Sequence, residues 1–486
     1  MTLLSLALLI PWAMGIVLVA LDGRRPVVGW AAVATLGVTL ATLLALGAGV
    51  MDGGEVVVTT GDWPRGVGIT LRADAAGLLF ALLSVGVVLA ATAHMVIGGV
   101  RERTFPGVVV LLAAGLTGLF LTGDLFNFYV FFELSMMSAY VLATYGGSRR
   151  SLGSALVFTT VNLLGTFVFL LSVAGVYHVT GTLDMAAIGE RMATVDPNAA
   201  ILVAVGFFVA FSVKLGLFPF HFWLPTVYTG ARPGVAAILS GGLANIGAYG
   251  LLRFGGELLP RELDLAAGAL VLIGGASVLY GGVLAISRHN GSEMLAYSAI
   301  GQVGYVLVAV GIGGPVGFAA AILYSVVNSL NKTLLFLTTR MRGAVVGWAF
   351  LLGALSVAGV PPAAGVRGQA GPVPGSRRRR GGAGAAVPGQ RDVAAVRVPR
   401  LPVRLLAHRA ARAAEPAWAA GRAGAGGRRG PRRGAVAGAP ASAERCRGRA
   451  GGRRPGRGGG AVSHRATRRP ASSRRRAGSP RSTCSC

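Results

Sequence analysis

The fold of this chain is decided by residues 200–225, which read AILVAVGFFVAFSVKLGLFPFHFWLP. The stretch is apolar and longer than the roughly 20 residues that cross a bilayer as a helix. It contains one charged side chain, Lys214. An ammonium at membrane depth costs roughly 3 kcal/mol or more, so a lysine persists there only with a partner, a water-filled cavity or a lost proton. The stretch indicates a membrane helix that carries a functional lysine.

A second charge interrupts another apolar stretch, because residues 125–140 read LFNFYVFFELSMMSAY and include Glu133. One carboxylate and one amine at membrane depth are the parts of a proton relay, since a desolvated lysine readily binds and releases a proton. The alternative is a static ion pair that orients two helices. Buried pairs stabilise less than apolar replacements, and charges inside membranes usually mark functional sites. The relay is therefore the favoured interpretation.

Apolar stretches of similar length run through the first 365 residues and predict an all-α polytopic membrane protein. The predicted spans are 2–20, 28–50, 74–98, 106–122, 124–145, 152–178, 199–219, 234–256, 264–286, 292–313 and 315–339. Abundant glycine in these stretches suits close packing of helices in lipid.

The charges of the connecting loops predict the orientation of the spans. Basic residues occupy every second connection: Arg24, Arg25, Arg101, Arg103, Arg149, Arg150, Arg232, Arg288, Arg340 and Arg342. Acidic residues lie in the connections that follow the second and sixth predicted spans: Asp52, Glu55, Asp62, Asp184, Glu190 and Asp196. Since cytoplasmic loops are enriched in Lys and Arg, we expect a multi-pass protein of the plasma membrane with its N-terminus outside.

Residues 366–486 differ sharply in composition from the first part. They contain 29 Arg, no Lys and three acidic residues, whereas residues 1–365 contain 17 Lys+Arg and 15 Asp+Glu. All three cysteines, Cys446, Cys484 and Cys486, also lie in this tail. The membrane part thus has no cysteine framework for a disulfide, metal or iron–sulfur site, and it has no nucleotide fingerprint. We expect no metal and no cofactor.

Several motifs in the first 365 residues resemble one family of membrane subunits. The motifs are LTGDLFNFYVFFE (121–133), KLGLFPFHFWLP (214–225), ARPG (231–234), LAYSAIGQVGY (295–305) and NKTLLF (331–336). They resemble the antiporter-like subunits shared by respiratory complex I, membrane hydrogenases and Mrp-type sodium/proton antiporters. The first outer loop, with GDWPRGVGI at 61–69, looks most like that of the D-type subunits of Mrp antiporters.

The resemblance implies two inverted repeats of five helices, each with a broken helix near the membrane midplane. It divides the chain into N-terminal helices at 1–103 with an outer loop at 51–73, a first repeat at 104–256 and a partial second repeat at 257–365. Proline disrupts helices, so Pro219 and Pro225 are the expected positions of the first break. Lys214 would then lie beside the break, where water can reach it.

The resemblance also assigns the relay residues. Glu133 and Lys214 match the family's Glu–Lys pair, and the proton would pass on to Lys332. Asn245 stands where the family usually has a lysine, and Asn328 stands where it commonly has a histidine. An asparagine can orient water but cannot carry the proton. His221, in the FHFW motif, fits either proton entry or structural anchoring.

The implied function is a proton-conducting subunit of a multisubunit monovalent cation (Na⁺)/H⁺ antiporter. Its partners would be other membrane subunits, the lipid bilayer, protons and the cation. The main alternative is a proton-pumping subunit of NADH–quinone oxidoreductase (complex I) or of a membrane hydrogenase, with the redox chemistry in partner subunits. Neighbouring genes separate these two. An alternative of another class is a membrane-anchored, arginine-rich protein that binds nucleic acid or lipid, and it predicts salt-dependent binding by the tail.

The tail reads as translated from the wrong reading frame. Arg, Gly, Ala and Pro dominate it, and these residue types have GC-rich codons. A single aromatic residue, Trp418, lies among its 29 arginines, which is too few for base stacking along the tail. Nucleic-acid binding is therefore not expected. The family continues after GVPPAAG (359–365) with a Gly-Phe-x-Gly-Lys type of sequence, whereas this chain has RGQAGPVPG (367–375). When RGQAGPVPG is written in suitable codons and read one base later, it translates as Val-Gly-Lys-Leu-Ala-Leu-Phe-Arg. A genuine disordered tail is the alternative.

We predict a shift of the reading frame near residue 365 in a bacterial gene of high GC content. Nucleotide reads across codons 360–376 should reveal one base too many or too few. Restoring the frame should turn a chain that cannot transport into an active one, because it supplies the lysine of the second broken helix. An intact frame, together with transport by the chain as given, would contradict this.

Overall fold

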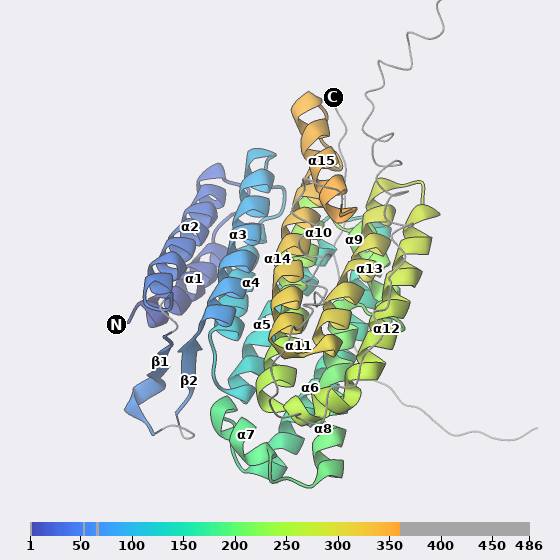
Figure 1. The fold of residues 1–486 in the computed structure, drawn as a ribbon. Helices are drawn as coiled ribbons and strands as arrows, with labels where there is room; N and C mark the ends of the chain where they lie inside the picture. The colour runs from blue at the N-terminus through green and yellow to red at the C-terminus, as the bar shows by residue number, and fades with distance from the viewer. Residues whose placement is uncertain (1, 52–53, 65–67, 360–486) are drawn as a thin grey trace, which may run out of the picture. The chain divides into compact units, whose positions relative to one another are not determined.

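The structure is a computed structural model that describes residues 2–51, 54–64 and 68–359, and these are helical almost throughout (Figure 1). The predicted frame shift and disorder of the tail lie outside the described residues. So does the broken helix expected after residue 365.

The predicted all-α membrane fold is confirmed. Among the described residues, ten helical segments are long and apolar enough to cross a membrane, and α4 and α15 are shorter apolar helices. The main helices are α1 (Leu3–Ala20), α2 (Pro26–Ala48), α3 (Ala75–Ile97), α4 (Phe105–Phe120), α5 (Leu125–Thr144), α6 (Arg149–Thr180), α8 (Pro197–Leu215), α12 (Pro260–Ile286), α13 (Gly291–Ile312), α14 (Gly314–Thr338) and α15 (Ala344–Val357). Every predicted span falls on a helix, whereas α15 was not predicted.

Two of the spans are not continuous α-helices. One combines α8, the 3₁₀ turn η2 (Phe220–Phe222) and α9 (Trp223–Gly230). The other combines α10 (Pro233–Ala237), the π-helical turn η3 (Ile238–Leu243), α11 (Asn245–Arg253) and a second π-helical turn, η4 (Phe254–Leu258). This second span is the most enclosed of the ten. Turns of π-helix inside α-helices are frequent at functional sites.

Side chains that cap helices set many of the boundaries. Asp74 accepts a hydrogen bond from the backbone N–H of Gly77 at the start of α3, and Asp124 does the same for Asn127 in α5. The short helix α7 (Met185–Met192) begins in the same way at Asp184. Such caps satisfy N–H groups that have no partner within the helix.

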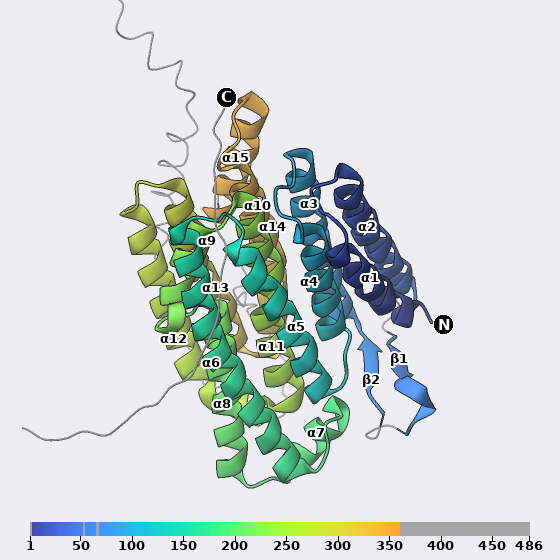
Figure 2. The same ribbon diagram turned by 180° about the vertical axis from the view of Figure 1, so that it is seen from behind.

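Glycines allow α12 and α13 to touch through their backbones. A Cβ atom at Gly281 would collide with the backbone of Gly301, and one at Gly304 would collide with the carbonyl of Gly274. In lipid, helices associate largely through such close packing of small residues. The two helices lie side by side in Figures 1 and 2.

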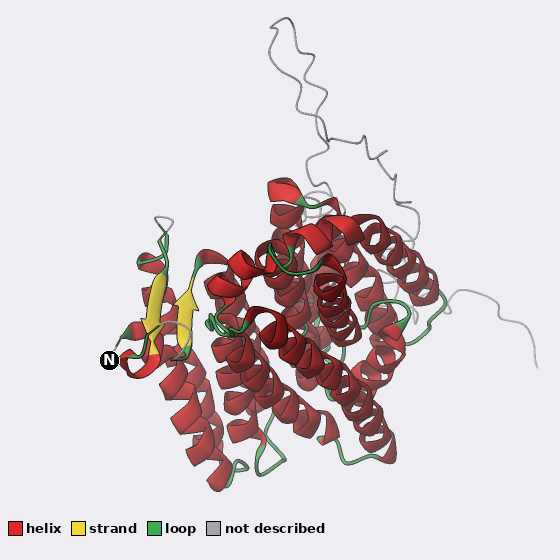
Figure 3. Ribbon diagram, turned by 90° about the horizontal axis from the view of Figure 1, so that it is seen from below, coloured by secondary structure: helices red, strands yellow, loops and turns green. Residues whose placement is uncertain are grey.

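The loop between α2 and α3 contains a hairpin that the sequence did not predict. Strands β1 (Val56–Thr59) and β2 (Thr70–Ala73) pair antiparallel, with Val56 opposite Ala73. The hairpin lies beside the N-terminal helices (Figure 3). The Nε of Arg72 in β2 binds Glu55 at 2.7 Å, and its Nη1 binds Glu257 of η4 at 3.1 Å.

A buried arginine extends this ion network into the helices. Arg253 at the end of α11 pairs with Asp74 and, at 2.7 Å, with Glu257, and its side chain is 2% exposed. Burial by itself would raise the pKa of the Asp74 carboxyl, but the charge of Arg253 and the N–H of Gly77 hold that pKa below its ordinary value. Asp74 therefore stays ionised and ties α3 to α11.

The glycine contacts predict an asymmetry between two positions of α12. Gly281→Ala should destabilise the chain by about 1–3 kcal/mol because the new methyl group overpacks the contact with α13. Gly275→Ala is the matched control, since nothing lies within 4 Å of a Cβ atom there. It should be neutral or slightly stabilising, as alanine favours helix. Thermal unfolding in detergent measures both, and equal melting temperatures would contradict the assigned packing.

Candidate functional site

The chain has two lysines, Lys214 and Lys332, and both are buried in membrane-spanning helices. Their exposed fractions are 4% and 0%. Every other basic side chain apart from histidine is an arginine. Arginine stays charged in proteins, whereas a buried lysine can release its proton. Lysine, which unlike arginine can lose its charge, therefore occurs in this chain only within membrane-spanning helices, where a charge is most costly.

Lys214 lies in the last turn of α8, next to a break in the helix. The helix ends at Leu215, and Gly216 adopts a left-handed conformation (φ 66°), which glycine does without steric cost. Pro219 lies within the interruption, directly before η2. Pro225 lies in the first turn of α9, where its missing N–H is tolerated. The interruption thus begins at Gly216 and not at either of the predicted prolines.

The Lys214 ammonium faces sulfur and aromatic rings. Its Nζ donates to Sδ of Met136 in α5 and lies 5.6 Å from the ring centre of Phe132 and 5.9 Å from that of Phe158. Aromatic faces attract cations, and more strongly when water is excluded. These contacts hold the amine without neutralising its charge.

The ion pair expected between Glu133 and Lys214 is not formed in this structure. Within the described part of the chain, the Lys214 ammonium has no carboxylate at ion-pair distance. Glu133 lies one turn before Met136 in α5, close enough to Lys214 for their charges to interact. Its Oε1 is buried without a hydrogen-bond partner. The hydrogen-bond partner of Nζ in α5 is Met136 instead.

Lys332 in α14 is held by neutral oxygens of the neighbouring helix. Its Nζ donates to the backbone carbonyl of Leu295 at 3.0 Å and to Oγ of Ser298 at 3.1 Å, both in α13. Among the described residues these neutral acceptors solvate the ammonium, and neither of them compensates its charge.

Asn245 joins three helices at the start of α11. Its Nδ2 donates to Oγ of Ser84 in α3 at 3.0 Å, to the Gly241 carbonyl at 2.9 Å and to Oγ of Ser329 in α14 at 3.4 Å. Ser329 lies one turn before Lys332. Sequence analysis missed both serines, although a hydroxyl within an apolar span was a signal that could have identified them.

The remaining predicted residues lie at other helix contacts. The ring centre of His221 in η2 lies 4.3 Å from that of Tyr280 in α12 and 5.7 Å from that of Phe218. Its Nδ1 is buried without a hydrogen-bond partner among the described residues. Asn328 in α14 also has a buried oxygen, Oδ1, without a partner. His221 thus connects the interruption after α8 to α12.

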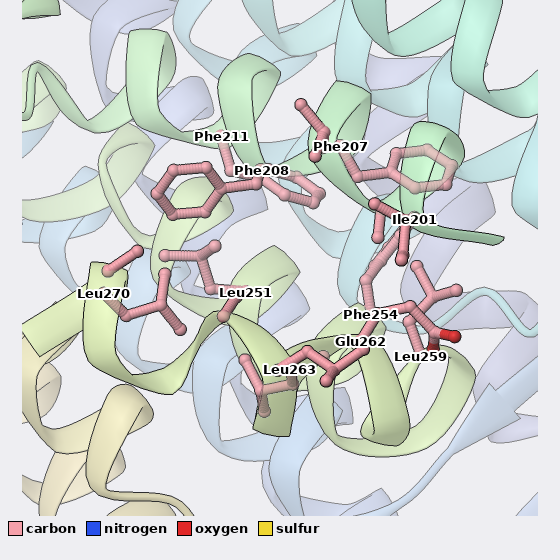
Figure 4. Close-up of a pocket in the computed structure, with 16 residues that line it drawn as sticks. Ile201, Phe207, Phe208, Phe211, Leu251, Phe254, Leu259, Glu262, Leu263 and Leu270 are labelled. Atoms are coloured by element: carbon pink, nitrogen blue, oxygen red, sulfur yellow. The ribbon is translucent and has the colours of Figure 1, made fainter. Parts of the chain in front are cut away.

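A cavity of about 310 Å³ lies between α8, the α11–η4 segment and α12 (Figure 4). Aromatic and aliphatic side chains such as Phe208 and Leu270 line it, and Glu262 is the one charged residue in its wall. Neither lysine nor Glu133 reaches it. The cavity is therefore apolar apart from Glu262 and is separate from the two lysines and Glu133.

The helix that carries Asn245 packs against the helices of both lysines. Contacts join α11 to α8, which carries Lys214, and to α14, which carries Lys332. Figures 1 and 2 show α14 and the α5–α6 pair on opposite faces of the bundle. The structure therefore arranges the Glu133 carboxylate, the two lysines and the intervening Asn245 with its serine partners across adjacent helices. Such a series can move a proton sideways within the membrane.

Comparisons with known proteins agree with this arrangement. Residues 122–344 match the family model described as NADH:quinone oxidoreductase/Mrp antiporter, transmembrane. The chain is 32% identical to the D-type subunit of a Na⁺/H⁺ antiporter from Alkalihalophilus pseudofirmus, with 75% of this chain and 78% of the relative covered. It is also 32% identical to the D-type subunit of a probable K⁺/H⁺ antiporter from Rhizobium meliloti, with 75% and 77% covered.

Solved structures extend the comparison. A chain in the Mrp complex from a Dietzia species is 30% identical, with a TM-score of 0.71 over 75% of this chain and 72% of that one. A chain of respiratory complex I from Thermus thermophilus is 25% identical, with a TM-score of 0.62 over 76% and 81%. The chain therefore belongs to the family of D-type antiporter subunits, a branch of the NADH:quinone oxidoreductase/Mrp antiporter membrane proteins.

Proposed function

We propose that the chain is the proton-conducting subunit of a multisubunit monovalent cation/H⁺ antiporter of the bacterial plasma membrane, with Na⁺ as the exchanged cation. The observation that carries the proposal is the restriction of lysine to two buried membrane positions, Lys214 and Lys332. The curated relatives, which are named as Na⁺/H⁺ and K⁺/H⁺ antiporter subunits, support the same activity.

In the proposed mechanism, Glu133 sets the charge of Lys214. When the carboxylate approaches, it stabilises the ammonium, and the lysine takes up a proton. When the carboxylate withdraws and Met136 takes its place, as in this structure, the ammonium loses its compensating charge and passes the proton on. The interruption after Leu215 leaves backbone groups without intrahelical hydrogen bonds, which favours access of water to this lysine.

Lys332 receives the proton across α11 in this mechanism. Asn245 cannot carry a proton as a charged intermediate, so it acts by orienting water together with Ser84 and Ser329. The neutral oxygens around Lys332 then let that lysine release the proton again.

The domain organisation is part of the proposal. Residues 104–256 would form the first inverted repeat and 257–365 the beginning of the second, behind the N-terminal helices of 1–103. The basic loops would face the cytoplasm, with the N-terminus outside. Neighbouring membrane subunits would supply the remainder of the cation pathway.

A second candidate function is proton pumping within a redox-driven complex. The observation in its favour is the similarity to chains of Thermus thermophilus complex I, with TM-scores of 0.62 and 0.66. Purification of the native assembly separates the two functions. Small membrane subunits without redox centres would indicate the antiporter, whereas subunits with flavin or iron–sulfur clusters would indicate the pump.

Replacing lysine by arginine tests proton release directly. In a frame-restored chain within its assembly, Lys214→Arg and Lys332→Arg should each abolish cation/proton exchange, because arginine keeps the positive charge but cannot release a proton. Glu133→Gln and Lys214→Ala should abolish exchange as well. Vesicles with a fluorescent pH probe measure the exchange, and immunoblots measure insertion into the membrane.

Arg150→Lys is the matched control, since the Arg150 side chain is 67% exposed in the first turn of α6, and it should leave exchange unchanged. Wild-type exchange by both lysine-to-arginine variants would reduce the lysines to structural cations. Variants that fail to insert are replaced by Lys214→Met and Lys332→Met, whose side chains approximate lysine in length.

A further inference from the structure

Two buried amide oxygens at the contact between α13 and α14 have no hydrogen-bond donor among the residues that the structure describes. They are Oε1 of Gln302 in α13 and Oδ1 of Asn328 in α14. Gln302 is 5% exposed. A buried carbonyl oxygen without a donor loses its hydration without compensation, at about 1–3 kcal/mol per group. Native structures rarely leave such groups unsatisfied, and an ordered water is the usual partner.

The register of the two helices places these amides opposite each other. On one side, Ser298 of α13 accepts a hydrogen bond from Lys332 of α14. On the other side, the rings of Tyr305 and Tyr324 lie 5.3 Å apart. Gln302 follows Ser298 by one helical turn and Asn328 precedes Lys332 by one turn, and the helices run antiparallel. Both amides therefore lie between these two contacts.

The chemistry of the two oxygens selects the missing group. Both are acceptors, so neither satisfies the other, and the group between them must donate two hydrogen bonds. Water does this and keeps two lone pairs for further partners. A bare metal cation typically takes about six oxygen ligands, which two amide oxygens do not provide. A polar site with at least two partners suits a buried water.

We propose that a buried water bridges Gln302 Oε1 and Asn328 Oδ1, and that it carries protons from Lys332 along the α13–α14 contact toward Tyr305 and Tyr324. This role rests on the proposed function. In the transfer, an N–H bond of the Lys332 ammonium breaks as an O–H bond forms on water. A different O–H bond of that water breaks as its proton binds the hydroxyl oxygen of Tyr305 or Tyr324, whose own O–H proton leaves in turn. Gln302 and Asn328 are positioning residues, because they hold the water and never bind the proton themselves.

The first test removes the two oxygens while keeping side-chain size. In the frame-restored assembly, Gln302→Met and Asn328→Leu should each slow exchange about tenfold, the equivalent of roughly one hydrogen bond removed from the path. Gln302→Glu keeps acceptor oxygens at the same place and should restore most of the rate. Ser325→Ala is the matched control on α14, since its hydroxyl donates only to Ala321 of its own helix at 2.7 Å.

The second test observes the water itself. A cryo-EM map of the wild-type assembly that resolves ordered waters should show one about 2.7–3.0 Å from both oxygens. The Gln302→Met map should lack it. A direct hydrogen bond from the Asn328 amide to Gln302, with no water, would overturn the proposal, as would exchange at the wild-type rate in a Q302M/N328L double variant.

These outcomes are separable from failure of the proposed function. If Glu133→Gln and Lys332→Arg abolish exchange while the double variant exchanges normally, the antiporter mechanism stands and the bridging water does not carry protons. If Glu133→Gln leaves exchange intact, the relay through Lys214 is wrong. The map then decides the water site by itself, and its absence overturns the site.

Discussion

The cost of an amine in hydrocarbon is the constraint on which the rest of this structure depends. Lys214 and Lys332 have exposed fractions of 4% and 0%, and a bilayer offers no solvent to replace the lost water. The protein surrounds each amine with weak, uncharged partners: a thioether and two rings for Lys214, a carbonyl and a hydroxyl for Lys332. Such partners hold an ammonium in place and still allow it to lose its proton.

This arrangement requires helices that are both closely packed and locally irregular. Glycine contacts such as that between Gly281 and Gly301 bring α12 and α13 together through their backbones. The interruption after Leu215 and the π-helical turns η3 and η4 place irregular backbone inside the bundle. Backbone that departs from α-helix is tolerated at membrane depth only where protein or water satisfies it. The irregular segments consequently adjoin Lys214, Asn245 and Arg253.

Two kinds of charge coexist and are used differently. Arg253 pairs with Asp74 and Glu257, and Glu257 also binds Arg72 of the β1–β2 hairpin, which links that hairpin to the end of α11. Arginine suits such a network because its charge is permanent and its planar group binds carboxylates in fixed geometry. The lysines lack carboxylate partners at bonding distance in the described residues. Arg253, whose charge is permanent, thus lies near the end of its span, whereas Lys214 and Lys332, which can lose a proton, lie within theirs.

Much of the fold could be predicted from the sequence. Membrane helices follow from apolar length alone, so all eleven predicted spans fell on helices, and Glu133, Lys214 and Lys332 stood out as charges within them. The short helix α15 was missed because its 14 residues fall short of a membrane span, and the β1–β2 hairpin was missed because a search for spanning lengths does not detect a pair of short strands in a loop.

The contacts between helices were decided by the tertiary structure. The separation of Glu133 from Lys214 depends on which side chain of α5 reaches the amine, and that side chain is Met136. The break after α8 begins at Gly216 instead of Pro219, because glycine alone adopts the left-handed cap without strain. The pairing of Asn245 with Ser84 and Ser329 joins residues far apart in sequence. Composition determines which segments enter the membrane, whereas helix rotation and register decide which of their polar atoms meet.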